Sequence, residues 1–174
     1  DPGSGVDWQH LAATALLLRE ELKALHLVAF VRSTGGKGLH VMVPIVRRHG
    51  WREVKAFAKA VAERLVDQAP RSYTASPSKR ARKGRLFIDY LRNTRGATAI
   101  TPYGTRAKPG APVATPLGWS ELSSSDLGPR RYTIKNLFRR LGQREDPWRG
   151  AWRRARSLGG PLKRLEKLEE RSEG

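Results

Sequence analysis

Two stretches of the sequence repeat apolar residues at the spacing of an amphipathic α-helix. Between residues 7 and about 25, leucine and alanine recur every three to four positions, and Asp7 is placed to cap the first turn. Residues 51 to about 67 repeat the pattern, and Pro70 lies just beyond its end. We therefore predict two helices, each with one apolar face turned toward a core.

Three shorter stretches have the composition of β-strands. Residues 27–32 and 40–46 are rich in Val, Phe and Ile and are separated by a glycine-rich segment, residues 33–38. Residues 85–91 alternate between two faces and place Asp89 among apolar neighbours. These strands and the helices predict a mixed α/β fold around one sheet flanked by helices.

The remaining segments have less regular patterns. Residues 71–84 are too polar for a core element and predict an exposed connection, while residues 98–116 mix Thr, Tyr and Val with Gly and Pro and predict short strands and turns. Residues 133–141 and 148–156 have helical spacing, and the charged residues 157–174 predict a tail that is a helix or a linker, so one domain occupies residues 1–156. The tryptophans lack the spacing of a base-stacking motif, and we expect them to pack in the interior: Trp8, Trp51, Trp119, Trp148 and Trp152.

The charge balance points to a polyanionic partner. Lys and Arg number 34 against 16 Asp and Glu, which gives a formal net charge of +18 and a sequence pI near 11.3. A solvated basic surface in an arginine-rich protein is the alternative. The absence of Cys excludes disulfides, thiolate zinc sites and cysteine nucleophiles. The most apolar stretch, residues 11–18, is too short to span a bilayer and no signal peptide pattern precedes it, so we expect a soluble, cytoplasmic protein without a membrane partner.

The glycine-rich segment is a candidate oxyanion site. Residues 33–40 read Ser-Thr-Gly-Gly-Lys-Gly-Leu-His and combine flexible backbone with the hydroxyl of Thr34, the ammonium of Lys37 and the imidazole of His40. Backbone N–H groups of glycines can approach a phosphate closely, and the side chains add donors. The Walker A spacing is absent. A plain hairpin turn, with His40 as a structural residue, remains open.

Two carboxylates are candidates for metal ligands. Asp89 would be costly to bury unless it is paired or bound to a cation, and Arg92 is its obvious structural partner. Asp1 lies at the apparent end of a strand, where a turn Asp before Pro2 is the simpler interpretation. Two carboxylates from separate strands are nevertheless what an oxygen-ligand Mg²⁺ or Mn²⁺ site requires.

Cationic side chains follow Asp89 in irregular stretches that contain Gly and Pro. Such cations can hold the phosphates of a nucleotide or a template backbone, and they can equally be solvated. They are Arg92, Arg95, Arg106 and Lys108.

Taken together, these segments resemble one family, the polymerase domain of bacterial ligase D, a member of the archaeo-eukaryotic primase superfamily used in non-homologous end joining. The blocks FIDYLRN and RxxPGAPVxTPL are highly specific in order and spacing, and the glycine loop adds to them. The matching segments span nearly the whole chain: residues 1–3, 33–44, 85–104, 106–117 and 146–148.

The resemblance implies a primase-polymerase-like fold and template-directed addition of nucleotides to a DNA 3′ end, with Mn²⁺ or Mg²⁺ held by three Asp residues. Asp1 matches the second Asp of the family's D-x-D-P motif, and Asp89 matches the third. The triphosphate-binding positions fall on Thr34, Lys37 and His40, and the cations beside the nucleotide on Arg92, Arg106 and Lys108. Implied partners are gapped DNA or DNA ends, a nucleoside triphosphate, ligase and nuclease domains of a parent chain, and a Ku-type end-binding protein.

This sequence departs from the family pattern in three respects. Thr34 stands for a usual Ser and Lys108 for a usual Arg, which keeps the charge and loses bidentate geometry. The amino-terminal portion of the domain and the first Asp would lie upstream of residue 1, so we expect the isolated chain to be inactive. A truncated, non-catalytic DNA-binding module is the rival interpretation. An RNA-binding protein ranks last, because RNP, KH and zinc signatures are absent.

Overall fold

The computed structural model describes the backbone of residues 1–173 and the side chains of residues 1–168 and 170. In chain order its helices and strands are α1 (Trp8–Ala24), β1 (Phe30–Ser33), β2 (Leu39–Met42), α2 (Trp51–Gln68), β3 (Tyr73–Thr74), β4 (Leu86–Phe87), β5 (Pro116–Leu117), the 3₁₀ helix η1 (Trp119–Ser123), α3 (Leu137–Gln143), the 3₁₀ helix η2 (Ala151–Arg154) and α4 (Gly159–Glu173). No helix in this part of the chain is long and apolar enough to cross a membrane.

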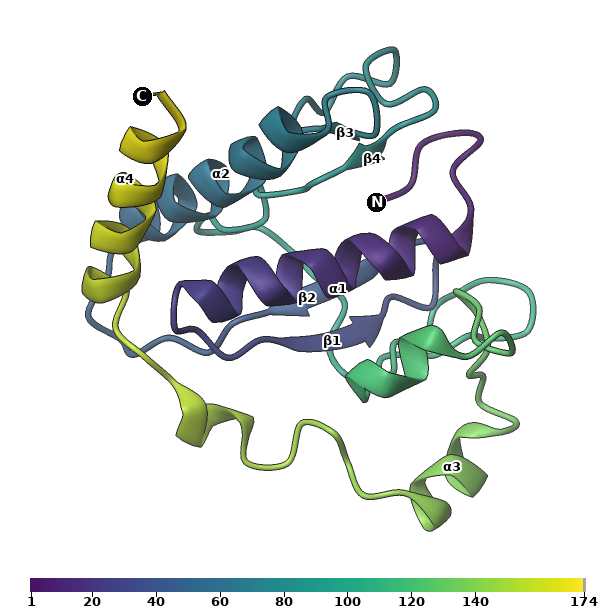
Figure 1. Cartoon of the computed structure of the whole chain (residues 1–174). Helices are drawn as coiled ribbons and strands as arrows, with labels where there is room; N and C mark the ends of the chain where they lie inside the picture. The colour runs from purple at the N-terminus through teal and green to yellow at the C-terminus, as the bar shows by residue number, and fades with distance from the viewer. Residues whose placement is uncertain (174) are drawn as a thin grey trace.

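The two long helices begin and end close to the predicted residues. Asp7 caps α1 by accepting a hydrogen bond from the His10 N–H at 2.7 Å, as its position in the sequence predicts. In α2 the buried residues recur on one face, which packs against the core, and Pro70 follows its end. α1 lies across β1 and β2, and α2 lies beside α4 (Figure 1).

The α/β prediction is confirmed, but the strands form two small sheets rather than one. In the first, β1 lies between β2 and β5, antiparallel to both, and the β1–β2 register sets Arg32 opposite His40. In the second, β3 and β4 run parallel, and the first residues of the chain pair antiparallel with β4 through Pro2 and Leu86.

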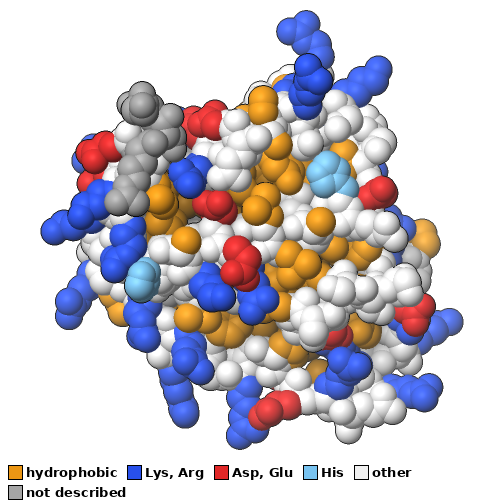
Figure 2. Space-filling model, in the orientation of Figure 1, with side chains coloured by type: hydrophobic (Ala, Val, Ile, Leu, Met, Phe, Trp, Pro, Cys, Tyr) orange, Lys and Arg blue, Asp and Glu red, His pale blue; other side chains and the backbone are white. Residues whose placement is uncertain are grey.

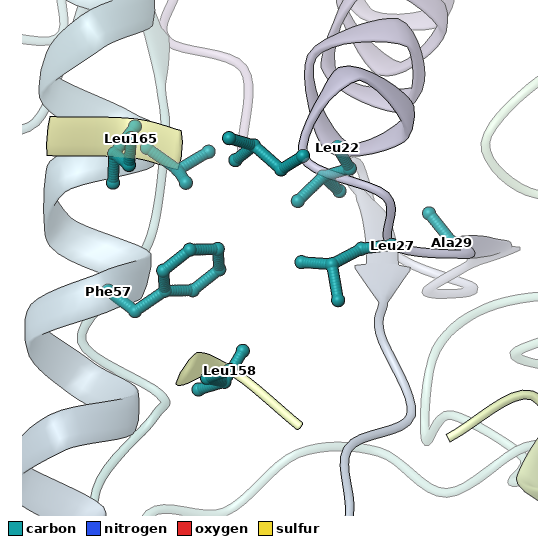
Figure 3. Packing of buried hydrophobic residues seen from close by; sticks show 8 residues of the cluster. Leu22, Leu27, Ala29, Phe57, Leu158 and Leu165 are labelled. Carbon is teal, nitrogen blue, oxygen red and sulfur yellow. The ribbon is translucent and has the colours of Figure 1, made fainter. Parts of the chain in front are cut away.

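Buried apolar side chains join the elements into one core. The cluster in Figure 3 brings together Leu22 and Leu27 around the end of α1, Phe57 of α2 and Leu165 of α4. Two neighbouring clusters join α1 to β1 and α1 to the β3–β4 sheet. Full burial of one such side chain, as at Leu65, contributes about 1.5–3 kcal/mol.

Four predictions from the sequence need correction. The strand predicted over residues 85–91 is regular only at Leu86–Phe87. The predicted exposed connection, residues 71–84, contains β3, whose two residues are buried. Two of the tryptophans expected in the interior are exposed, Trp51 at 56% and Trp152 at 74%.

The fourth correction concerns the carboxy-terminal helices. The predicted helix over residues 133–141 begins only at Leu137, and of residues 148–156 only η2 is helical. Of the two interpretations of the charged tail, a helix or a linker, the structure has the helix α4. Leu158 and Leu165 are buried in the first cluster, so this segment packs on the core. The domain boundary at residue 156 stays a prediction.

Candidate nucleotide-binding site

Asp1 and Asp89 are brought together by the pairing of the first residues with β4. The Asp1 nitrogen donates to the Phe87 carbonyl at 2.9 Å, and the Phe87 N–H donates to the Asp1 carbonyl at 2.9 Å. Asp89 follows Phe87 by two residues, and the Ile88 N–H between them continues the ladder to β3 at 3.0 Å. Because alternate residues of an extended chain share a face, Asp89 lies on the side of the ladder where Asp1 lies. Both residues line one cavity of about 410 Å³.

The cavity has both polar and apolar lining residues. Core residues of α1, β2 and α2 line most of it. Of the predicted site residues, His40 and Arg92 line it together with the two aspartates, and Arg32 lines it as well. Thr34, Lys37, Arg106 and Lys108 do not line it. A site that combines carboxylates, cations and an apolar wall is suited to a charged ligand with an apolar part.

The Asp89 carboxylate is bonded to Arg92 and still has lone pairs available for a ligand. Its Oδ1 accepts from the Leu91 N–H at 2.9 Å, and its Oδ2 accepts from Arg92 Nε at 3.3 Å. The ion pair that the sequence left open therefore exists, with side-chain exposures of 61% for Arg92 and 19% for Asp89. Each carboxylate oxygen keeps a further lone pair, so these bonds leave Asp89 able to accept from a ligand or cation.

The glycine loop lies directly against Asp1. A Cβ at Gly38 would lie 2.4 Å from Asp1 Oδ1, so any larger residue there would displace the Asp1 carboxylate. Gly35 has a φ of +63°, and its added Cβ would lie 3.0 Å from Arg106 Cγ. Arg106 therefore runs along the loop, as expected for a cation beside a phosphate-binding segment.

Thr34 supports the loop from within. Its hydroxyl donates to the Gly38 carbonyl at 3.0 Å and accepts from the Gly36 N–H at 3.2 Å, and the residue is only 9% exposed. These bonds hold the loop closed, because they join its first and last residues. The predicted contact of the Thr34 hydroxyl with a phosphate stays a prediction.

Lys37 and Lys108 lie outside the cavity. Both side chains are exposed, and neither residue lines the cavity that holds the two aspartates. Arg95 is likewise exposed. Lys37 and Lys108 would contact a ligand that extends from the cavity over the loop.

The donor set for a metal ion is incomplete within the described residues. Asp1 and Asp89 provide the oxygen ligands that Mg²⁺ and Mn²⁺ prefer, but the side chains that the structure describes contain no group of three or more His, Cys, Asp or Glu that could hold a metal. His40 also fits a metal poorly, because its Nδ1 is bonded to Arg32. The residues present therefore supply part of a cation site.

Arg32 is the member of the site that sequence reasoning missed. It is 8% exposed and lies opposite His40 in the register of β1 and β2. The signal was available in part: a hairpin closed by residues 33–38 can set Arg32 opposite His40, which puts both side chains on one face.

Basic side chains are spread over much of the molecular surface. Figure 2 shows Lys and Arg side chains along the outline of one face and also near its middle, among apolar and acidic side chains. With a net charge of +18, such a surface attracts polyanions at long range.

The fold and the site thus define a basic α/β protein with paired carboxylates beside a glycine loop. The family model described as "LigD, primase-polymerase domain" matches residues 1–148. The chain belongs to this family.

Named relatives agree with this assignment. The chain is 39% identical over 150 residues to the multifunctional non-homologous end joining protein LigD of Pseudomonas aeruginosa, a match covering 85% of this chain and 18% of that protein. It is 29% identical over 149 residues to the bifunctional LigD of Bacillus subtilis, covering 85% and 24% of the two chains. The chain therefore spans less than a quarter of the length of these relatives.

A solved structure shares the fold. The polymerase domain of Mycobacterium tuberculosis ligase D in complex with DNA superimposes with a TM-score of 0.82 at 32% identity, covering 89% of this chain and 53% of that one. The primase-polymerase-like fold inferred from the sequence is thereby confirmed.

Proposed function

We propose that this chain contributes the nucleotide-binding part of a template-directed nucleotidyltransferase that adds nucleotides to DNA 3′ ends in non-homologous end joining. The observation that carries the proposal is the cavity that Asp1, His40, Asp89 and Arg92 line together beside the glycine loop. Membership of the LigD family and the DNA-bound structural relative support it.

The reaction joins the 3′ oxygen of a primer to the α-phosphorus of a nucleoside triphosphate. The bond from the α-phosphorus to pyrophosphate breaks as the new bond forms. In this scheme the chain's own residues bind and orient the triphosphate: Arg92 and Arg106 offset its charge near the cavity, and Lys37 and Lys108 reach it from the surface. His40, which lines the cavity, donates a hydrogen bond to the triphosphate.

Asp1 and Asp89 would be the ligands of a divalent cation, Mn²⁺ or Mg²⁺, that neutralises the triphosphate. The pairing of the first residues with β4 also indicates where a third carboxylate ligand of the cation would lie. Asp1 lies opposite Phe87 and Pro2 opposite Leu86, so in the same register a residue two positions before Asp1 would lie opposite Asp89. That is the position of the first Asp in the family's D-x-D-P motif.

A non-catalytic DNA-binding module is the second candidate. The incomplete donor set in residues 1–173 favours it, because the basic surface would persist without turnover. Binding of this kind would weaken strongly with salt and would not depend on Mn²⁺. The ligase, nuclease and Ku-type partners implied by the family stay predictions for this chain.

The test is Mn²⁺-dependent addition of labelled ATP and dATP to a primed, 5′-phosphorylated gapped DNA. We would compare this chain, a version extended upstream through the D-x-D-P motif, and Asp89→Asn and Asp126→Asn variants of that version. Asp126 is exposed and remote from the cavity, so its variant is the matched control. We expect nucleotide addition by the extended version and by its Asp126→Asn variant, and none by this chain or by the Asp89→Asn variant. If the extended form binds DNA and adds no nucleotide, the binding-module interpretation replaces the catalytic one.

A further inference from the structure

Arg32 is a buried cation without a carboxylate partner in the described part of the chain. It is 8% exposed, and none of the ion pairs among the described side chains, those of residues 1–168 and 170, includes it. Its guanidinium lies over the ring of Trp148, 5.6 Å from the centroid. That ring is itself fixed, because Trp148 Nε1 donates to the Val31 carbonyl at 3.0 Å. Burial of a guanidinium without a counter-ion costs free energy unless other groups interact with it.

The side chain of Arg32 makes two hydrogen bonds, and both go to one atom of His40. Arg32 Nε lies 3.3 Å and Nη2 lies 3.0 Å from His40 Nδ1. An arginine side chain has only donors, so His40 Nδ1 must be the acceptor and carry no proton. In a neutral imidazole the proton then resides on Nε2.

We propose that Arg32 is a positioning residue that fixes His40 as the neutral Nε2–H tautomer and turns that N–H toward a phosphate oxygen of a bound nucleotide. The proposal rests on the proposed function for its ligand, while the tautomer follows from the contacts alone. His40 and Arg32 both line the cavity that holds Asp1, Asp89 and Arg92. Nε2 donates no hydrogen bond to any described side chain or backbone group, so it is available to a ligand.

The electrostatics of the site agree with a neutral ring. Burial, and next the neighbouring Arg32, lower the pKa of His40 to about 4, against the opposing effect of Asp89. The two side chains thus divide their roles. Arg32 provides a permanent positive charge beneath the site, and His40 provides one directed donor whose orientation does not change with pH near neutrality.

The first test is ¹⁵N NMR of the histidine rings in this chain. The chain has 4 histidines, and an His40→Gln variant identifies the signals of His40. We expect a protonated Nε2 and a bare Nδ1 at neutral pH in the unmodified chain. Signals of an Nδ1–H ring or of an imidazolium would overturn the proposal, whatever the variants do.

Variants of Arg32 separate positioning from general stability. Arg32→Met removes the donors and should release the ring into a mixture of tautomers, while Arg32→Lys keeps a donor and should restore the Nε2–H form. Arg19→Met is the matched control, because Arg19 also stacks on a tryptophan, 5.3 Å from the Trp119 centroid, and has no histidine partner. An unchanged tautomer in Arg32→Met would overturn the role of Arg32. If that variant fails to fold, the unmodified chain and Arg32→Lys still decide the question.

Binding of ATP with Mn²⁺ gives the second readout. A glutamine amide can place an N–H near the position of His Nε2, and an asparagine amide near that of Nδ1. We therefore expect His40→Gln to keep most of the ATP affinity, and His40→Asn and Arg32→Met to lose about tenfold, as for one hydrogen bond to a charged group. Equal losses in the Gln and Asn variants would overturn the assigned donor. If the unmodified chain shows the Nε2–H ring and binds no ATP, the proposed function fails while the tautomer assignment stands.

Discussion

Gly38 and Asp1 approach so closely that a Cβ at Gly38 would lie 2.4 Å from Asp1 Oδ1. The contact joins the glycine loop to the carboxylate proposed as a cation ligand. Gly38 does not have a positive φ, so its backbone conformation does not require glycine. The glycine is explained instead by the Asp1 side chain, which occupies the space that a Cβ would need.

We predict that Gly38→Ala displaces the Asp1 carboxylate, and that it lowers nucleotide addition strongly but the unfolding free energy only slightly. Asp1 is exposed and can rotate away, so unfolding free energy should fall by less than about 1 kcal/mol, below the usual cost of overpacking. Mn²⁺-dependent nucleotide addition by the extended form should fall at least tenfold, about 1.4 kcal/mol. Gly128→Ala is the control, because no atom lies within 4 Å of its added Cβ. Equal activity in both variants would show that the contact does not position Asp1.

A second prediction concerns the ion pair between Asp89 and Arg92. Because Arg92 is 61% exposed at the side chain, Arg92→Ala should change the unfolding free energy by less than about 1 kcal/mol. The affinity for ATP should fall, since a cation beside the cavity is lost. Arg95→Ala removes a nearby exposed cation that does not line the cavity and should leave ATP affinity unchanged. Isothermal titration of both variants checks this, and similar losses would indicate general charge attraction.

The parts of the fold that the sequence predicted well depend on local signals. α1 and α2 were predictable because their apolar periodicity and the Asp7 cap act within a few residues. The hairpin of β1 and β2 was predictable because glycines mark its turn. The cavity brings together Asp1, His40, Asp89 and Arg92, which residue chemistry and the family resemblance had singled out, and their roles stay predictions.

The parts that were missed depend on contacts distant in sequence. β3 lies in a polar segment and becomes a strand only because Tyr73 and Thr74 pair with Leu86 and Phe87. The strand at β4 ends early because Asp89 Oδ1 accepts from the Leu91 N–H, which turns the chain. Trp51 and Trp152 show that a large aromatic residue alone does not predict burial.

A third prediction concerns a buried ion pair that supports β5. Glu121 accepts from Arg140 Nη2 at 2.8 Å, and the same Arg140 nitrogen donates to the Pro116 carbonyl at 3.0 Å. The side chains are 12% and 6% exposed, so Glu121→Gln would leave a buried guanidinium without its counter-ion. We expect a loss of about 3 kcal/mol in unfolding free energy, measured by urea unfolding at neutral pH. Glu20→Gln is the control: Glu20 pairs with Lys23 and its side chain is 57% exposed, so its loss should change the unfolding free energy by less than about 0.5 kcal/mol.

A fourth prediction gives this ion pair a pH dependence. Burial opposes the charged form of Glu121, but hydrogen bonds from Arg140 and the Gly118 N–H outweigh it and hold the pKa of Glu121 below its ordinary value of 4.5. Above pH 4.5 the carboxylate is ionised in both the folded and the unfolded chain, so the full stabilisation is present. As the pH falls below that value, the unfolded chain takes up the proton first, and the stabilisation is lost as the pH passes through the lower folded pKa.

The measurement for this prediction is the difference in unfolding free energy between the unmodified chain and Glu121→Gln at a series of pH values. Other carboxylates titrate in both proteins, so their contributions largely cancel in the difference. We expect the difference to be constant above pH 4.5 and to shrink steadily below it. A difference that stays constant to the lowest pH at which both proteins fold would show that Arg140 does not stabilise the charged carboxylate, and that the two side chains act only as a neutral hydrogen-bonded pair.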